Sequence, residues 1–242
     1  MLVTSAVDEL LFHQRSMFTS KLFWIDAICI DQKTNSEKNE QLPMMADIYR
    51  RASRVVVWLG APESRKETHT LRKFIGIFNY PEWYESINAF LPYFFDNEEE
   101  AYIAVGKLLS HPWFERIWIV QEVAVGKTVH VMYHGTCINW EILAAVIKRL
   151  CTDGDLKRGL KYYNSPNRTN TPDQKGFRNT AAHTIPEDRP SQVATITSIR
   201  NSIQIGSPSS LPLLFPITNM FKATNPRDKV FAILGEAHKA GR

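Results

Sequence analysis

The sequence predicts an α/β fold with a parallel sheet, because two apolar runs enclose a helical stripe. Residues 23–30 (FWIDAICI) and 55–59 (VVVWL) are short and almost continuously apolar, as strands covered on both faces of a parallel sheet are. Between them, apolar side chains recur at helical spacing, namely Leu42, Met45, Tyr49 and Ala52. A strand, a helix and a second strand in this order predict a right-handed βαβ unit with parallel strands.

Further elements complete the N-terminal part. A helix near the start has Val7, Leu10 and Leu11 close together on its surface, and a later helix has acidic residues in its first turn, where the helix dipole favours them. In chain order the elements are a helix over residues 6–15, a helix over 98–109, a strand over 129–133 and, after a turn at 134–136, a helix over 140–150. The aromatic-rich residues 63–97 are expected to form a helix and a loop.

The predicted N-terminal domain of residues 1–152 is followed by a change in composition. Only 8 of the 39 residues in 153–191 are hydrophobic, against 44% of the whole chain, so this segment is expected to be a flexible linker or insertion. Residues 192–242 are expected to be helical and to pack on the N-terminal domain. Their last helix is expected to follow the N-cap Asn225 and to stop at Gly235.

Composition and charge restrict the function. The 242 residues carry a net charge of +4 that is spread along the chain, which does not indicate a nucleic-acid partner. Three well-separated cysteines form neither a disulfide framework nor a zinc pattern, so we expect a cytoplasmic protein that holds no metal. No apolar run approaches the roughly 18 residues that span a bilayer, and no membrane partner is expected. The sequence also lacks the glycine-rich loops and histidine motifs of dehydrogenases, P-loop NTPases and zinc hydrolases.

Four sequence words carry a resemblance to a known family. They are FWIDAICIDQ, EKNEQLPMMADIYRRASRVVVWLG, HPWFERIWIVQEV and NPRDKVFAILG. In order and spacing these words resemble the fungal heterokaryon-incompatibility (HET) domain, over residues 5–150 and 190–236. The resemblance implies a role in self/non-self recognition after cell fusion and in programmed cell death. It also implies a core like that of Toll/interleukin-1-receptor (TIR) domains, which is flavodoxin-like.

The same resemblance implies an enzymatic site. Some TIR domains cleave NAD with a glutamate that lies four residues after a tryptophan, and Trp118 and Glu122 have this spacing, which places both on one helical face. On this hypothesis Glu122 is catalytic: it holds the ribose and stabilises the oxocarbenium-like charge as the nicotinamide bond breaks, while Trp118 stacks on a base. The alternative is that Trp118 belongs to the core and Glu122 pairs with Arg116 or another basic group. NAD is then a substrate, and no cofactor is expected.

Four residues are candidates for substrate binding besides Trp118. Asp26 interrupts an apolar run, so we expect it either to line a pocket or to have a partner such as Arg54, Arg116 or backbone N–H groups. Asp31 and Gln32 follow the predicted strand, at the edge where parallel sheets bind ligands; alternatively they form a turn or a helix cap. Arg116 could bind a phosphate or a carboxylate, although an internal ion pair is slightly favoured.

Two residues of the last sequence word are expected to have structural roles. Asp228 is interpreted as a helix-start residue, where a carboxylate favours the helix dipole. Arg227 is expected to tie the last helix to the N-terminal domain.

The chain departs from the family at its beginning. HET domains usually open with a strand and turn of the form Y.ALSY.WG, and this chain starts after that position, so we expect a sheet short of one strand and a site short of one wall. In addition, Asp31 stands where the family usually has Asn. Two classes of function remain: an NAD glycohydrolase that acts through Glu122, and a non-catalytic TIR-like module that signals as a homo-oligomer or by binding a receptor or incompatibility partner protein.

Overall fold

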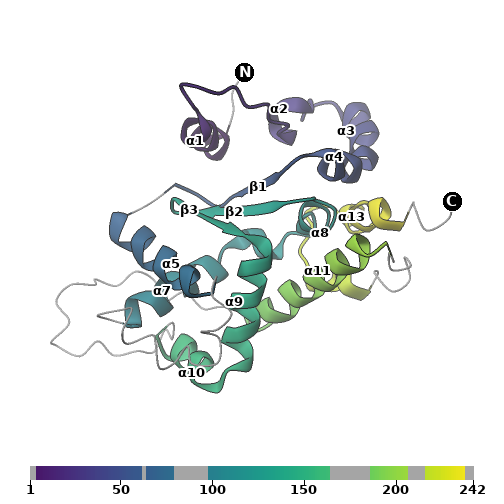
Figure 1. Ribbon diagram of the computed structural model, residues 1–242. Coiled ribbons are helices and arrows are strands. Elements are labelled where there is room, and N and C mark those ends of the chain that lie inside the picture. The colour runs from purple at the N-terminus through teal and green to yellow at the C-terminus, as the bar shows by residue number, and fades with distance from the viewer. Residues whose placement is uncertain (1–3, 62–63, 79–97, 164–185, 207–215, 238–242) are drawn as a thin grey trace.

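The computed structural model describes residues 4–61, 64–78, 98–163, 186–206 and 216–237. In these residues the fold is mixed α/β, with helices on both sides of one small sheet (Figure 1). The predicted α/β class is therefore confirmed.

Three strands form the sheet of the described residues, in the order β1 (Val55–Trp58), β2 (Val129–Tyr133) and β3 (Thr136–Asn139). β1 and β2 are parallel, with Val57 opposite Val131. β2 and β3 are antiparallel, with Val131 opposite Ile138. The predicted strands at 55–59 and 129–133 are confirmed, but the sheet is mixed rather than parallel throughout.

β3 lies where only a turn into a helix is expected from the sequence. His134 and Gly135 have positive φ angles of 45° and 74°, which suit a two-residue hairpin loop whose twist matches that of the flanking strands. β3 alternates the buried Thr136 and Ile138 with less buried neighbours. An alternation of four residues is too short for the sequence pattern to separate from a turn.

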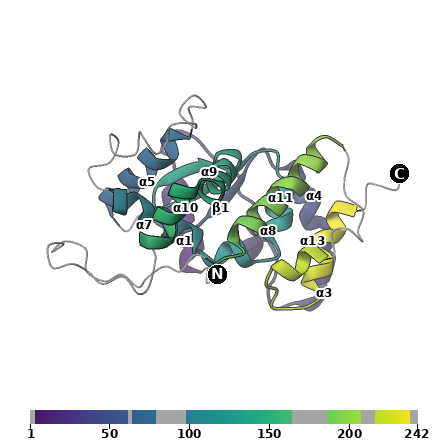
Figure 2. The ribbon, with the colours of Figure 1, turned by 90° about the horizontal axis from the view of Figure 1, so that it is seen from below.

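The buried face of the sheet packs against two helices, α5 (Arg65–Ile77) and α9 (Trp140–Thr152), and α7 (Glu98–Leu109) packs on α5 (Figure 2). Val131 of β2, Phe74 of α5 and Leu143 of α9 are all fully buried in this core. The helices predicted at 98–109 and 140–150 are thus confirmed.

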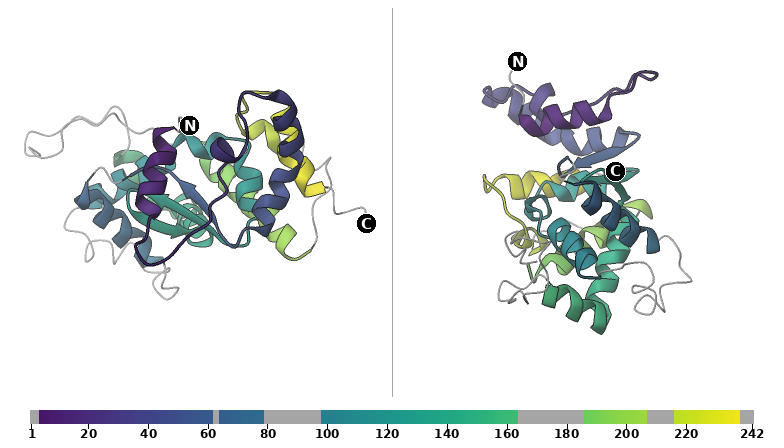
Figure 3. Two further views of the ribbon diagram at one scale, coloured as in Figure 1. Left: turned by 90° about the horizontal axis from the view of Figure 1, so that it is seen from above. Right: turned by 90° about the vertical axis from the view of Figure 1, so that its left-hand side faces the viewer.

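A looser layer covers the other face of the sheet. α1 (Ser5–Gln14) lies there, where the ring of His13 is 5.3 Å from that of Trp58 and the Gln14 amide donates to the Met132 sulfur at 3.0 Å. Figure 3 shows that the helices of residues 4–51 form one layer over the rest of the molecule. The helix predicted at 6–15 is confirmed.

The predicted strand at residues 23–30 is wrong. Four of these residues form a short helix, α2 (Asp26–Cys29), closed by hydrogen bonds from Cys29 N to Ile25 O at 2.8 Å and from Ile30 N to Asp26 O at 3.1 Å. Only Ile30 of the run is buried, so the segment lies at the surface of the N-terminal layer and not inside a sheet. The predicted βαβ unit is therefore wrong as well, and the parallel partner of β1 is β2.

The predicted helix after residue 40 is divided into three parts. α3 (Asn35–Gln41) leads through the 3₁₀ turn η1 (Leu42–Met44) into α4 (Met45–Arg51). Pro43 lies in η1, and because proline has no N–H to donate, a change of helical hydrogen bonding at this point is expected.

The described residues of the C-terminal part include two long helices, with limits that differ from those expected. α10 (Gly154–Tyr163) occupies the start of the segment expected to be flexible, and residues 164–185 of that segment lie outside the described residues. α11 (Arg189–Gln204) and α13 (Asp228–Ala237) pack against α8 (Ile119–Ala124). Gly235 lies inside α13, so the predicted stop at this glycine is wrong.

No helix in the described residues is long and apolar enough to cross a membrane.

Candidate active site

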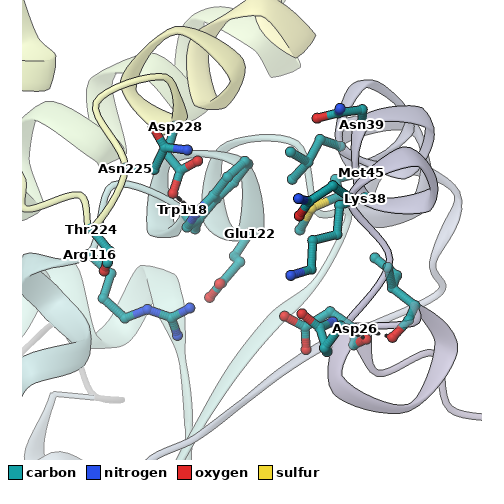
Figure 4. A pocket seen from close by; sticks show the side chains of 14 residues that line it. Asp26, Lys38, Asn39, Met45, Arg116, Trp118, Glu122, Thr224, Asn225 and Asp228 are labelled. Atoms are coloured by element: carbon teal, nitrogen blue, oxygen red, sulfur yellow. Dashed lines mark hydrogen bonds between the residues drawn. The ribbon is translucent and has the colours of Figure 1, made fainter.

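A cavity of about 520 Å³ lies between the N-terminal layer and the helices α8 and α13. One wall comes from residues 26–45 of α2, α3 and α4, and the other comes from residues 116–122 and 224–228. Figure 4 shows side chains from both walls directed into the space between them. They include three carboxylates (Asp26, Glu122, Asp228) and two cations (Lys38, Arg116).

The short helix α8 forms part of one wall, and a 3₁₀ turn precedes it. His111 Nδ1 accepts the Trp113 N–H at 3.1 Å, which starts the 3₁₀ turn η3 (Pro112–Glu115) with its proline in the first turn. Arg116 is extended, and Trp118 is the N-cap of α8. The sequence PWFERIW thus forms a 3₁₀ turn and an extended residue immediately before the helix.

A buried guanidinium fixes the other end of α8. Arg200 of α11 is 2% exposed and donates to the carbonyl oxygens of Val123 at 2.8 Å, Gly126 and Lys127 at 3.1 Å, which satisfies acceptors that a helix end leaves free. It also forms an ion pair with Glu141 at 2.8 Å. α8 is thereby held from both ends.

Glu122 reaches the cavity from the middle of α8. Its Oε2 accepts a hydrogen bond from the Trp113 indole at 2.9 Å. Burial raises the pKa of Glu122 above its ordinary value, against the opposing effects of the Arg116 charge and the Trp113 hydrogen bond. The negative charge of Asp26 adds to the increase.

Trp118 lies beside Glu122 on the same wall. The Glu122 N–H donates to Trp118 O at 3.1 Å, so the predicted helical relation between the two is present, and both side chains line the cavity. The Trp118 indole is half-buried and donates to Asp228 Oδ2 at 3.3 Å. Asp228, expected only to start a helix, therefore also orients a pocket side chain.

Arg116 does not form the internal ion pair that the sequence analysis slightly favoured. Its guanidinium has no ion-pair partner within the part of the chain that the structure describes, and it lines the cavity. Its backbone is held in a parallel bridge to Lys222, where Ile117 N donates to Lys222 O at 2.9 Å and Lys222 N donates to Glu115 O at 2.6 Å. The Arg116 guanidinium therefore remains open to the cavity.

Asp26 lines the cavity from α2 and is not in a strand. Its side chain is exposed, and Oδ1 accepts the Ala27 N–H at 2.7 Å, so of the expected partners a backbone N–H is the one observed. Ion pairs with Arg54 or Arg116 are not found among the described residues. An exposed carboxylate has water as a partner, which removes the reason for expecting such a pair.

Asp31 and Gln32 have different positions. Asp31 forms a turn, accepting the Lys33 N–H at 2.9 Å and the Thr34 hydroxyl at 2.6 Å, and these hydrogen bonds lower its pKa; it is not part of the cavity wall. Gln32 does line the cavity. Its amide donates to Asp26 O at 3.0 Å, which ties it to the end of α2.

Tyr49 shows how closely the two walls approach. This half-buried phenol lies on α4, and its pKa is raised well above its ordinary value by burial and by the negative charges of Glu122 and Asp26. The carboxylates of both walls therefore act on one region.

Several lining residues were not found from the sequence, namely Asn35, Lys38, Asn39, Thr224, Asn225 and Asp228. The first three recur at positions i, i+3 and i+4 of α3, so they share a face. A search for polar stripes, and not only apolar ones, would have found this face. Arg227, expected to tie the last helix down, is exposed, and the Gln121 amide makes that connection instead by donating to Phe231 O at 2.8 Å.

The site holds no metal-binding geometry: within the described ranges, no group of three or more His, Cys, Asp and Glu side chains could hold a metal ion.

Fold and site define a small mixed α/β domain with a polar cavity lined by a half-buried glutamate and a half-buried tryptophan. Comparison with known proteins gives the family. Residues 1–122 match the family described as Heterokaryon incompatibility protein (HET), and the chain belongs to this family.

A similar curated protein is "Heterokaryon incompatibility protein 6, OR allele" from Neurospora crassa, which is 30% identical over 149 residues. The match covers 50% of this chain and 22% of that protein, so the chain corresponds to a minor part of its relative. No solved structure matches the chain. The family match ends at Glu122, whereas the cavity wall continues to Asp228.

Proposed function

We propose that this protein acts in fungal heterokaryon incompatibility, as a self/non-self recognition protein that triggers cell death, and that its cavity cleaves NAD. Membership of the HET family and the similarity to a Neurospora incompatibility protein support the biological part. The convergence of Glu122, Trp118 and Arg116 on one cavity supports the chemical part.

The proposed reaction is hydrolysis of an N-glycosidic bond. The bond between ribose C1′ and the nicotinamide nitrogen breaks, and its electron pair goes to the nitrogen, so the pyridinium leaves as neutral nicotinamide. Positive charge develops on the ribose, and water then adds to C1′ and loses a proton. A carboxylate beside C1′ stabilises this charge and positions the sugar hydroxyls.

Glu122 is suited to this role by its surroundings. One oxygen is held by the Trp113 indole at 2.9 Å, which leaves the other available to a ligand and fixes the plane of the carboxylate. The adjacent indole of Trp118 offers a surface for stacking, and its hydrogen bond to Asp228 limits its rotation. This pair of fixed side chains is the observation that carries the proposal.

The test is NAD breakdown by the purified 242-residue protein, followed by mass spectrometry. We expect nicotinamide and ADP-ribose from the wild type and a loss of at least about a hundredfold in Glu122→Gln, which keeps the shape and removes the charge. Glu9→Gln, an exposed glutamate of α1 outside the cavity, is the matched control. A folded wild type that leaves NAD intact would refute the catalytic role.

A non-catalytic interaction module is the second proposal, favoured by a different observation. Met17, Phe18 and Leu22, which follow α1, are 93%, 93% and 102% exposed. Apolar side chains this exposed and this close in sequence mark interaction surfaces more often than solitary ones do. If toxicity in a fungal host survives Glu122→Gln but is lost in the triple change of these residues to Ser, together with a smaller oligomer, the interaction module is supported.

A further inference from the structure

Two cationic side chains face the cavity from opposite walls. Lys38 lies on α3, Arg116 lies just before α8, and Figure 4 shows both directed into the space between the walls. Across the described residues, neither side chain has an ion-pair or hydrogen-bond partner. Within the part of the chain that the structure describes, the two positive charges are therefore without a direct partner.

The three carboxylates of the cavity, in contrast, each have a hydrogen-bond donor. Glu122 accepts from Trp113 at 2.9 Å, Asp228 accepts from Trp118 at 3.3 Å, and Asp26 accepts from the backbone N–H of Ala27 at 2.7 Å. Because the charged groups without a partner are cationic, a ligand with an anionic group gains more from this cavity than the same ligand without it.

The chemistry of the two cations fits a phosphate. Arginine presents a planar fork that binds two phosphate oxygens, and lysine adds a compact point charge. Asn35 and Asn39 share the face of α3 with Lys38, so amide groups suited to sugar hydroxyls lie next to the lysine.

We propose that Arg116 and Lys38 bind the phosphate of the substrate from two sides, so that the cavity selects phosphorylated N-ribosyl compounds over the corresponding free nucleosides. The inference rests on the proposed function for its choice of scissile ligand, and it is tested by binding rather than by turnover.

The two probes are nicotinamide mononucleotide and nicotinamide riboside, which share the N-glycosidic bond and differ by one phosphate. Binding is measured by calorimetry on the full chain with Glu122→Gln, so that turnover is slow compared with binding. We expect the mononucleotide to bind about tenfold more tightly or better. Arg116→Ala and Lys38→Ala, each added to this background, should remove most of that preference and leave riboside binding within about twofold.

Two further variants control for charge and for folding. Lys33→Ala removes an exposed lysine outside the cavity and should keep the preference. Arg116→Lys keeps the charge but loses the planar fork, so it should retain part of the preference. Equal affinities for the two probes, binding of neither, or an equal loss in Lys33→Ala would overturn the inference.

The outcome separates this inference from the catalytic proposal. A wild type that does not cleave NAD, together with a phosphate preference that disappears in Arg116→Ala, supports the phosphate site and removes the catalytic role. Cleavage of NAD with no preference between the two probes supports the catalytic role and overturns the phosphate site.

Discussion

The core around the sheet and the N-terminal layer of residues 4–51 differ in how many side chains they bury. The core strands and the helices α5 and α9 contribute many side chains that are less than 2% exposed, among them Phe74, Val131 and Leu143. The N-terminal layer contributes few buried side chains, such as Val7, Ile30 and Met45. The cavity lies where the two regions meet. The wall of residues 116–122 and 224–228 packs against the densely buried core, whereas the wall of residues 26–45 belongs to the layer with few buried side chains. A ligand that touches both walls would therefore stabilise the weaker one.

The largest expected difference comes from the same substitution in the two regions. Phe74→Ala, in α5, removes a fully buried ring and should lower the free energy of unfolding by roughly 3–5 kcal/mol. Phe18→Ala, in the N-terminal layer, removes a ring that is 93% exposed and should change it by less than about 0.5 kcal/mol. Urea unfolding of both variants measures the contrast, and similar losses would show that the N-terminal layer is as tightly packed as the core.

The next effect concerns the buried guanidinium behind the site. Arg200→Ala leaves the carbonyl groups at the end of α8 and the carboxylate of Glu141 without their donor, so we expect a loss of roughly 3 kcal/mol of stability. Arg51→Ala removes an exposed arginine of α4 and serves as the control, with an expected change within about 0.5 kcal/mol. Thermal unfolding measures both. An unchanged stability in Arg200→Ala would mean that α8 does not depend on this cap.

Substitutions of two glycines by alanine should change the stability by smaller amounts, and the two changes should have opposite signs. A Cβ at Gly126 would lie 2.7 Å from Val55 Cγ2 and 3.0 Å from the backbone oxygen of Glu122, so Gly126→Ala should displace the end of α8 and cost roughly 1–3 kcal/mol. A Cβ at Gly76 in α5 would meet nothing within 4 Å, so Gly76→Ala should stabilise the helix by up to about 1 kcal/mol. Chemical denaturation of the two variants side by side checks the signs.

The smallest expected effect is a pH dependence that has opposite signs at the cavity and in α5, away from it. The pKa of Glu122, at the cavity, is raised by burial, so its contribution to stability is full below the pKa of the unfolded chain and is lost as the pH rises through the folded pKa. The pKa of Glu67, in α5, is lowered by hydrogen bonds from His134 and Lys107, so its contribution is present above the unfolded pKa and is lost as the pH falls through the folded pKa. Stability is measured from a pH well below the ordinary glutamate pKa up to neutral pH. Below that pKa it should rise less steeply with pH in Glu67→Gln, and above that pKa it should rise more steeply in Glu122→Gln.

Catalysis, if Glu122 acts as a carboxylate, should follow the same titration. The raised pKa means that the ionised form accumulates only at higher pH than for an ordinary glutamate, so the rate of NAD cleavage should increase with pH through that range. A pH–rate profile measures this, with the interpretation confined to the acid limb of the curve. A rate that falls as the pH rises there would assign Glu122 the role of a proton donor.

How much of the fold could be predicted depended on the strength of the local pattern. The strand VVVW is β-branched and is closed by Gly60, the helix of residues 98–109 begins with acidic residues, and both were predicted correctly. The run FWIDAICI has the composition of a strand, yet it folds into the short helix α2 because it lies at the surface of the N-terminal layer and has no neighbouring strand to pair with. The place of this segment in the tertiary structure determines its conformation, and the composition of the segment does not encode that place.

For the site, spacing within one helix was predictable and convergence between segments was not. The four-residue spacing of Trp118 and Glu122 was sufficient to place them on one wall. Nothing in the sequence around Lys38 or Asp228 indicates that residues so far apart in the chain share a cavity. Their roles follow from the packing of α13 against η1 and α4, which is a long-range contact.

The bridge between Arg116 and Lys222 has a consequence for the order of events during synthesis. The ribosome releases the chain from its N-terminus. Ile117, Trp118 and Gln121 of this wall donate hydrogen bonds to Lys222, Asp228 and Phe231, so these bonds form only when the acceptors have emerged. The cavity is therefore among the last features of the domain to form.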